Sequence, residues 1–497
     1  MESCQVSILR LIYYGFVTMR ASHLPRPDGC LDAIALWFVN ERIAEFSREH
    51  HSEAASRIAI TLHVLRSCVA SSTGARTGPC HFHGFGRRGS EMTITEGRRD
   101  VAVVTPWYPM RHSVFSGAFV QAMVAATAPG CDSMTVYHTD GWGTQRSDED
   151  DRLVWRALDR LLRGGVPLSR TVAGAGLRFV PVANRSGSSF ASAAKSYAKA
   201  LGIALGGRPL PEPVVHAHVG LRGGYVALEN AAPDARVFVT EHATYLEALL
   251  AQPDSRAMYD EVIGRADGFF AVGEPVRAPL VDAFPHHADK ISLIPNPVRF
   301  DRLTSQPVTE PRRWLFIGNL IERKGVSLLL EAFAKCHADD PWLTLSFAGQ
   351  GPLSQPLHDR AAELGIAEAV MFLGPLTPDQ TLDAMAGHDL LVHPSRLETF
   401  GMTIIEAIAV GTPVLVTRCG GPEETLTGIE TAASEFIDVT DSADDIVDGY
   451  RRLRDRIPYD LDLSLAQRTL AARYGYEAVG ALHHRIWFAD APQRTQP

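Results

Sequence analysis

The chain has 497 residues, of which 45% are hydrophobic and 21% are charged. These are ordinary values for globular proteins, and the length exceeds what one hydrophobic core supports, so about two or three domains are expected. The formal net charge of -9 excludes a chain-wide positive field, and we therefore expect no nucleic acid partner.

The seven cysteines include no Cys-x-x-Cys pair, and most of them precede residue 97. This scatter is typical of a protein in a reducing compartment. The longest apolar run near the start, residues 8–19, contains Arg10 and is shorter than the roughly 20 residues that span a bilayer. We therefore expect a cytoplasmic location, without a transmembrane helix or a signal peptide.

Residues 1–97 show no consistent helical or strand period. Met92 stands directly before the first regular segment, so one hypothesis is that residues 1–97 contain a mis-assigned start and that translation begins at Met92. A genuine but poorly ordered extension is the alternative.

Regular patterning begins at about residue 98, where short apolar runs start to alternate with amphipathic stretches. This alternation is typical of parallel α/β units. We assign residues 98–300 to an N-terminal Rossmann-like domain. Its predicted strands cover residues 101–105, 134–138, 177–180, 214–218, 237–241, 269–272 and 291–294.

A second series of predicted strands follows a linker that contains several prolines, residues 297–313. We assign residues 314–472 to a second Rossmann-like domain, so the predicted fold class is α/β with two such domains. The strands of this series cover residues 314–317, 343–347, 370–373, 390–392 and 414–417.

Residues 390–424 carry two glutamates in a strand, loop and helix pattern. Glu398 lies in the predicted loop and Glu406 lies in the helix, so the two carboxylates are expected at different depths of one pocket. Glu406 has aliphatic neighbours and needs hydrogen-bond donors, which a ribose diol supplies; a solvent-facing glutamate is the alternative. The backbone N–H groups at Gly401 and Met402 begin the helix, where they favour a phosphate.

Two further loops follow predicted strands of the second domain. Arg323 and Lys324 end the first loop, where their charges can neutralise a diphosphate leaving group; an exposed basic loop is the alternative. Gly349 and Gly351 form the second loop, and Ser354 stands where a dinucleotide fingerprint requires a third glycine. A nicotinamide cofactor is therefore not expected.

The predicted N-terminal domain carries its candidate residues at strand ends as well. Gly117 opens a helix after the loop at residues 106–109. His218 ends one strand and His242 follows the next, so both are expected at the carboxyl edge of the sheet. A satisfied structural histidine is the alternative for each.

These residues resemble the signature of the retaining glycosyltransferases of family 4, in which seven residues separate two glutamates, and a small-residue turn and Gly-Gly follow. Here the signature consists of Glu398, Glu406, residues 411–413 and residues 420–421. The resemblance covers about residues 101–487. It implies the GT-B fold, in which two Rossmann-like domains face each other across a cleft and a C-terminal helix, here within residues 473–497, returns to the first domain.

The resemblance also implies a role for each matched position. Glu398, His218 and Lys324 are implied catalytic residues, with Glu398 contacting the transferring sugar. Asn319 stands where the family usually has an arginine, which leaves Arg323 as the candidate second cation for the diphosphate. The implied substrate-binding residues are Gly117, Asn319, Arg323, Gly349, Gly351, Phe400, Gly401, Met402, Thr403, Glu406 (donor ribose) and His242 (acceptor side).

The implied activity is retaining transfer of a hexosyl group in glycan biosynthesis, from a UDP-sugar or GDP-mannose to a glycan, lipid-linked or small-molecule hydroxyl. No cofactor or metal is expected, because the acidic run Asp148 to Asp151 is more typical of a solvated loop than of a manganese site. The alternatives are a nucleotide-sugar epimerase or a phosphorylase on the same fold, and a non-catalytic nucleotide-sugar or glycan-binding protein. The sequence leaves the oligomeric state open.

Residues 152–163 predict an amphipathic helix in which arginines accompany Trp155, Leu158, Leu161 and Leu162. Peripheral contact with the inner face of an anionic membrane is one interpretation, and an ordinary surface helix is the other.

Overall fold

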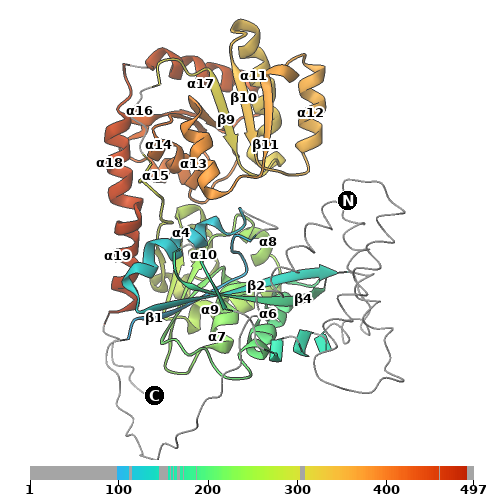
Figure 1. The fold of residues 1–497 in the computed structure, drawn as a ribbon, viewed down its shortest axis with the longest axis vertical. Helices are drawn as coiled ribbons and strands as arrows, with labels where there is room; N and C mark the ends of the chain where they lie inside the picture. Colours follow the sequence, from blue (N-terminus) through green and yellow to red (C-terminus); the bar gives the residue numbers. More distant parts are fainter. Residues whose placement is uncertain are drawn as a thin grey trace, which may run out of the picture. The chain divides into compact units, whose positions relative to one another are not determined.

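A computed structural model describes residues 98–110, 115–144, 155–156, 158–160, 162–164, 168–171, 173–185, 187–302, 308–457 and 459–489. The hypotheses on residues 1–97 and Met92 and on the acidic run from Asp148 to Asp151 concern residues outside this part of the chain. The described residues form two separate β-sheets, each flanked by helices (Figure 1).

The first sheet has the strand order β3-β4-β2-β1-β5-β6-β7-β8 in the described residues. All neighbouring strands are parallel except β3, which runs antiparallel to β4 at the edge. The strands are β1 (Asp100–Thr105), β2 (Ser133–Thr144), β3 (Leu168–Arg170), β4 (Gly176–Arg185), β5 (Val214–His218), β6 (Arg236–Glu241), β7 (Gly268–Ala271) and β8 (Ile291–Leu293). All seven strands expected from the apolar runs are present, and β3 is additional.

Helices cover this sheet because the central strands bury both of their faces. Residues 101–105 of β1 are fully buried, for example. The longer helices are α4 (Ala118–Thr127), α6 (Phe190–Ala204), α9 (Pro253–Arg265) and α10 (Glu274–Ala283). Between β5 and β6 lie a π-helical turn, η2 (Gly220–Tyr225), and α7 (Val226–Asn230). Shorter helices elsewhere in this domain are η1 (Ala128–Gly130), α8 (Leu246–Leu250) and η3 (Pro285–Lys290).

The second sheet is parallel throughout the described residues, with the order β11-β10-β9-β12-β13-β14. Its strands are β9 (Arg313–Ile317), β10 (Thr344–Ala348), β11 (Val370–Gly374), β12 (Leu390–His393), β13 (Val414–Thr417) and β14 (Ser434–Ile437), of which β14 was not predicted. Its helices are α11 (Val326–Asp339), α12 (Ser354–Glu363), α13 (Pro378–Ala386), α14 (Met402–Val410), α15 (Gly421–Thr425), α16 (Glu430–Ala433) and α17 (Ala443–Arg456). A capping box fixes the start of α13, where the Thr377 hydroxyl accepts from the N–H of Gln380.

The strand order of each sheet reverses at one central strand. In the first sheet the chain proceeds outward from β1 to β2 on one side and to β5 on the other, and in the second sheet β9 has β10 and β12 as neighbours. Open parallel sheets bind ligands outside the carboxyl ends of the strands at such a reversal. The loops after β1, β5, β9 and β12 are therefore where a site is expected.

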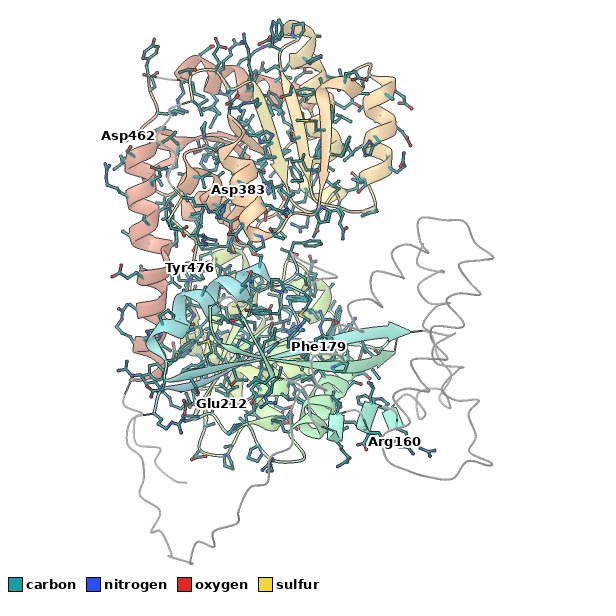
Figure 2. The ribbon with its side chains drawn as sticks, in the orientation of Figure 1. Arg160, Phe179, Glu212, Asp383, Asp462 and Tyr476 are labelled. Atoms are coloured by element: carbon teal, nitrogen blue, oxygen red, sulfur yellow. The ribbon has the colours of Figure 1, made fainter. Side chains whose placement is uncertain are left out.

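Two helices end the described chain, α18 (Leu463–Tyr474) and α19 (Tyr476–Trp487); Figure 2 labels Tyr476 at their junction. α19 packs against α4, and a Cβ on Gly480 would overlap the carbonyl oxygen of Ala126. Trp487 is 1% exposed, and its indole N–H donates to Nδ1 of His216 over 3.1 Å. The last helix therefore completes the core on one face of the first sheet.

The amphipathic segment at residues 152–163 is helical at those of its residues that the structure describes. Leu158 and Leu162 are buried in the first domain, whereas Arg160, which Figure 2 labels, is exposed. These two leucines therefore pack on the domain and not toward a membrane, which favours the ordinary surface helix at these positions. Within the described residues, no helix combines the length and the hydropathy needed to cross a bilayer.

Candidate functional site

Loops at the carboxyl edge of the second sheet pack backbone against backbone. A Cβ on Gly349 would overlap the carbonyl oxygen of Gly318, and a Cβ on Gly351 would overlap that of Leu320. A Cβ on Gly325 would likewise overlap the carbonyl oxygen of Pro394. The predicted glycine turns therefore bring the loops after β9, β10 and β12 together at this edge.

The same edge holds a buried ionic cluster. The Lys324 ammonium lies 2.5 Å from Oε1 of Glu398, and Nε2 of His393 lies 2.8 Å from the same oxygen. The His393 ring stacks on Phe316, and its Nδ1 has no hydrogen-bond partner among the described residues. The structure thus joins two predicted catalytic residues and adds His393, which the sequence analysis did not select although it ends a buried strand five residues before Glu398.

Neighbouring groups outweigh burial in setting the ionisation of Glu398, whereas burial decides that of His393. Burial alone would raise the pKa of Glu398, but Lys324 and His393 hold it well below its usual range. Burial lowers the pKa of His393, so its ring is neutral at physiological pH. The cluster therefore consists of an ammonium, a carboxylate and a neutral imidazole.

Arg323 and Asn319 lie in different surroundings. The Arg323 guanidinium donates to the carbonyl of Leu397 over 2.5 Å, so it braces the loop that carries Glu398. Asn319 is exposed, and its backbone carbonyl accepts from the backbone N–H of Ile321. To contact a diphosphate as predicted, Arg323 would therefore have to bind the ligand and the Leu397 carbonyl at the same time.

The start of α14 presents open backbone donors. Gly401 caps the helix with a φ of 86°, a conformation that favours glycine. The first N–H groups of a helix lack partners within the helix, here those at Met402 and Thr403. Phe400 is buried and packs edge-on against Tyr474, which fixes the entry of the chain into the helix.

Glu406 lies in the second turn of α14, between the buried residues Ile405 and Ala407. Its carboxylate has no hydrogen-bond partner among the described residues, and burial raises its pKa to about 7, an effect that Arg299 partly offsets. Arg299 was not selected from the sequence, because it falls in the predicted linker. The structure therefore does not join Glu406 to Glu398, and leaves it in need of donors, as its aliphatic neighbours predicted.

In the first sheet, the loop after β1 is held against the start of α4. Gly117 has a φ of 73°, and a Cβ there would overlap the backbone of Trp107. The Trp107 ring meets Phe119 edge-on, and Phe119 packs on His242 with 4.3 Å between ring centroids. Gly117 therefore allows the loop after β1 to reach the predicted histidines.

His218 and His242 form a neutral pair. Nδ1 of His218 lies 2.9 Å from Nε2 of His242, and Nε2 of His218 is buried without a partner among the described residues. Burial lowers the pKa of His242 to about 3, and burial with the neighbouring histidines lowers that of His218 well below its usual value. His216 shares the face of β5 but bonds Thr240 and Trp487, so its role is structural.

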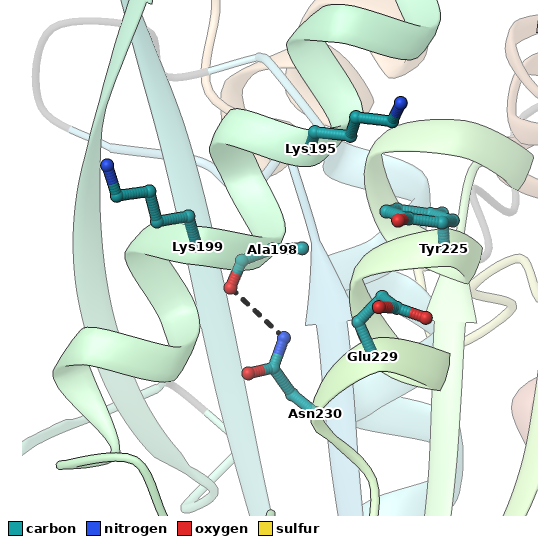
Figure 3. A pocket seen from close by; sticks show the side chains of 6 residues that line it. All are labelled: Lys195, Ala198, Lys199, Tyr225, Glu229 and Asn230. Atoms are coloured by element: carbon teal, nitrogen blue, oxygen red, sulfur yellow. Dashed lines mark hydrogen bonds between the residues drawn. The ribbon is translucent and has the colours of Figure 1, made fainter.

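Other polar groups lie away from these strand ends. In the described residues, Asp260, His286 and His287 bring ligand atoms close enough to share a metal ion, but His286 and His287 both already contact Asp260. A surface hollow between α6 and α7 is lined by Lys195, Ala198, Lys199, Tyr225, Glu229 and Asn230 (Figure 3). There Lys199 lies over the Trp155 ring and Glu229 pairs with Arg265, which leaves Lys195 as the charged group of the hollow without a partner among the described residues.

Comparison with known families identifies the second sheet and its loops. Residues 299–456 match the family Glycosyl transferases group 1, and residues 210–302 match Glycosyltransferase Family 4. Residues 299–456 are therefore similar to the group 1 glycosyltransferases. The family 4 resemblance predicted from the two glutamates is confirmed.

Individual glycosyltransferases of this kind align over part of their length. The D-inositol 3-phosphate glycosyltransferase of Geodermatophilus obscurus is 32% identical over 236 residues, which are 42% of this chain and 52% of that protein. The glycogen synthase of Mycobacterium tuberculosis is 26% identical over 288 residues, or 53% of this chain and 69% of that protein. The match to the first relative thus spans about half of its length.

Solved structures share the fold over most of the chain. The HepE protein of Anabaena in complex with UDP and glucose superposes with a TM-score of 0.56 at 16% identity, covering 79% of this chain and 100% of that one. The sucrose-phosphate synthase of Thermosynechococcus elongatus gives a TM-score of 0.60 at 18% identity, with the same coverage. The chain therefore has the predicted GT-B fold.

Proposed function

We propose that this protein is a retaining glycosyltransferase that takes a hexosyl group from a nucleotide sugar. The observation that carries the proposal is the buried Lys324, Glu398 and His393 cluster beside the open N-terminus of α14. A cation and aligned N–H donors at one strand edge suit a departing diphosphate.

The ribose of the donor's nucleotide would bind at the half-buried Glu406. A carboxylate whose pKa is raised by burial gains most from a ligand that brings hydrogen-bond donors, and a ribose diol brings two. A UDP-sugar is the first candidate, because the HepE structure of the same fold contains UDP and glucose. GDP-mannose is the second.

The diphosphate would meet Lys324 and the N–H groups at Gly401, Met402 and Thr403. An ammonium has three donors, and the recorded contact with Glu398 uses one of them. Lys324 can therefore bind a phosphate oxygen without leaving Glu398. With this fixed cation in place, we propose that transfer proceeds without a metal ion or another cofactor.

In the transfer step the bond from the anomeric carbon to the phosphate oxygen breaks, and a bond from that carbon to the acceptor oxygen forms on the same face. The departing phosphate takes the proton of the acceptor hydroxyl. Glu398 and the unpartnered Nε2 of His218 orient the sugar, and His242 fixes the tautomer of His218 through their shared hydrogen bond.

The test uses the full chain with UDP-, GDP-, ADP- and dTDP-sugars, with and without EDTA, and measures free nucleoside diphosphate. We expect release from one donor that resists EDTA and falls by about 10²-fold or more in Glu406→Ala. Conversion of a donor without release would indicate an epimerase, and a requirement for inorganic phosphate would indicate a phosphorylase. A donor-dependent thermal shift without turnover of any kind, with acceptors supplied, would indicate a binding protein.

A further inference from the structure

Three side chains that can bind a metal ion converge on the surface of the first domain. Asp260 lies on α9, and His286 and His287 are consecutive residues of η3. Each side chain offers one ligand atom, and these three atoms lie within 4.8 Å of one another. Two elements that are separate in the sequence therefore bring two imidazoles and a carboxylate to one place.

Both histidines approach the same carboxylate oxygen. Nε2 of His286 lies 2.6 Å from Oδ1 of Asp260, and Nε2 of His287 lies 3.2 Å from that oxygen. Ligand atoms that are each about 2.0–2.1 Å from a tetrahedral Zn²⁺ are about 3.3 Å from one another. The atoms that contact each other here are thus the ligand atoms themselves, and small side-chain movements would let an ion replace the hydrogen atoms between them.

The backbone beneath these side chains is held by other contacts. Lys290 ends η3, and its ammonium donates to three carbonyls at the end of α9, those of Ile263, Gly264 and Ala266. A Cβ on Gly264 would lie 3.4 Å from Cε1 of His287, so this ring packs against the helix. A metal ion would therefore not have to order the backbone on which its ligands stand.

The Asp260 carboxylate is not neutralised by a permanent cation. Its ion pairs in the described part of the chain are those with the two histidines. The cations on the same two elements are used elsewhere: Arg256 donates to a backbone carbonyl, Arg265 pairs with two glutamates, and Lys290 binds the end of α9. An ion that binds Asp260 therefore displaces no arginine or lysine.

The ligand set can be reached from solvent and selects a class of metal. The side chains of Asp260 and His286 are 46% and 58% exposed. Two imidazole nitrogens and one carboxylate oxygen suit Zn²⁺ and similar transition metal ions, whereas Mg²⁺ and Ca²⁺ prefer oxygen ligands alone. Three protein ligands leave a tetrahedral ion one further position, which water can occupy.

We propose that Asp260, His286 and His287 bind one divalent transition metal ion, with Zn²⁺ as the first candidate, and that this ion links η3 to α9. None of the three ligands is among the residues that we assign to sugar transfer. The inference therefore goes beyond the proposed function and does not depend on it. Nucleoside diphosphate release should resist EDTA in either case.

The test titrates the metal-free full chain with Zn²⁺ and with Mg²⁺ by calorimetry. The chain has 19 histidines and seven cysteines, so the deciding quantity is the Zn²⁺ binding event that a site variant removes. We expect one such event to be lost, or weakened about tenfold or more, in His286→Gln and in Asp260→Asn. Mg²⁺ should show no event that depends on these residues.

The matched control is His358→Gln, because His358 is also exposed but does not belong to this cluster. Thermal unfolding gives a second reading: Zn²⁺ should raise the Tm of the wild type and of His358→Gln more than that of either site variant. Either site variant decides alone if the other does not fold. The inference would be overturned by the absence of Zn²⁺ binding in the wild type, by binding that survives in a folded site variant, or by an equal loss in His358→Gln.

Discussion

At the scale of single residues, the Lys324 and Glu398 pair is the most consequential contact of the site. Both side chains are almost buried, at 13% and 11% exposure. Removing one partner leaves the other charge buried and unpaired, so we expect Lys324→Met to destabilise the fold by about 3–5 kcal/mol. Urea denaturation measures this change.

The matched control is an exposed pair of the same domain, Arg360 with Glu331. Arg360→Met should leave the free energy of unfolding nearly unchanged, because water screens such pairs. An equal loss in Lys324→Met and Arg360→Met would show that the Glu398 cluster is not desolvated as described.

Replacement of Glu406 is expected to stabilise the fold, in contrast to replacement of Lys324. Burial raises the pKa of Glu406 in the folded protein to about 7. In the unfolded chain the same carboxyl ionises at a lower pH, so the fold loses stability as the pH rises from that pKa toward 7, and the loss is complete above pH 7. Glu406→Gln should therefore stabilise the protein at pH 8 by about 1–2 kcal/mol, after allowing for its partial exposure, and hardly at all at pH 5.

Thermal unfolding of wild type and Glu406→Gln at the two pH values measures this difference. The same variant should bind the donor more weakly, because a neutral amide replaces the carboxylate that accepts from the ribose. A gain in stability that is equal at pH 5 and pH 8 would contradict the assigned ionisation.

At the scale of elements, the glycine loops are the feature most open to test. Gly351→Ala places a Cβ on the carbonyl of Leu320, so the loops after β9 and β10 must separate. We expect a loss of about 2–4 kcal/mol, together with a loss of donor binding. Gly387→Ala is the control, since its Cβ would meet the nearest oxygen at 3.3 Å and its φ is -84°; equal effects would contradict the role of Gly351.

The sequence predicts these elements well because parallel strands that are buried on both faces leave uninterrupted apolar runs. The missing strands, β3 and β14, lie at sheet edges: Leu168 of β3 is 58% exposed, and β14 contains the half-buried Glu435. Unlike the predicted edge strands β8 and β11, these two strands lack a continuous apolar run, and β3 is defined only by its antiparallel pairing with β4.

Part of the site was also predictable, because its loops follow the predicted strands directly. Glycines and charged residues at strand ends indicate which loops are candidates for chemistry, and the family resemblance supplied the roles expected of Glu398 and Glu406. The contact between Lys324 and Glu398 joins positions 74 residues apart, and the π-helical turn after β5 depends on the close packing of Gly223 on His218. Neither leaves a local pattern in the sequence.

At the scale of the whole molecule, the last helix is part of the first domain's core. Trp487 is 1% exposed, so Trp487→Ala should destabilise that domain by about 3–5 kcal/mol, measured by denaturation. Trp342 is 77% exposed, and Trp342→Ala should change stability by about 0.5 kcal/mol or less. Equal losses in the two variants would mean that α19 does not pack as described.

The central claim, that the carboxyl edge of the second sheet binds a nucleotide sugar, can be tested without knowing the acceptor. Calorimetric titration of the full chain with UDP, GDP and their sugars measures donor binding directly. We predict that one nucleotide binds, and that its affinity falls about tenfold or more in Lys324→Met. The fitted stoichiometry should be the same in both proteins, which shows that the variant is folded. If none of these ligands binds to the wild-type protein, or if Lys324→Met binds as tightly as wild type, the account of this site is wrong.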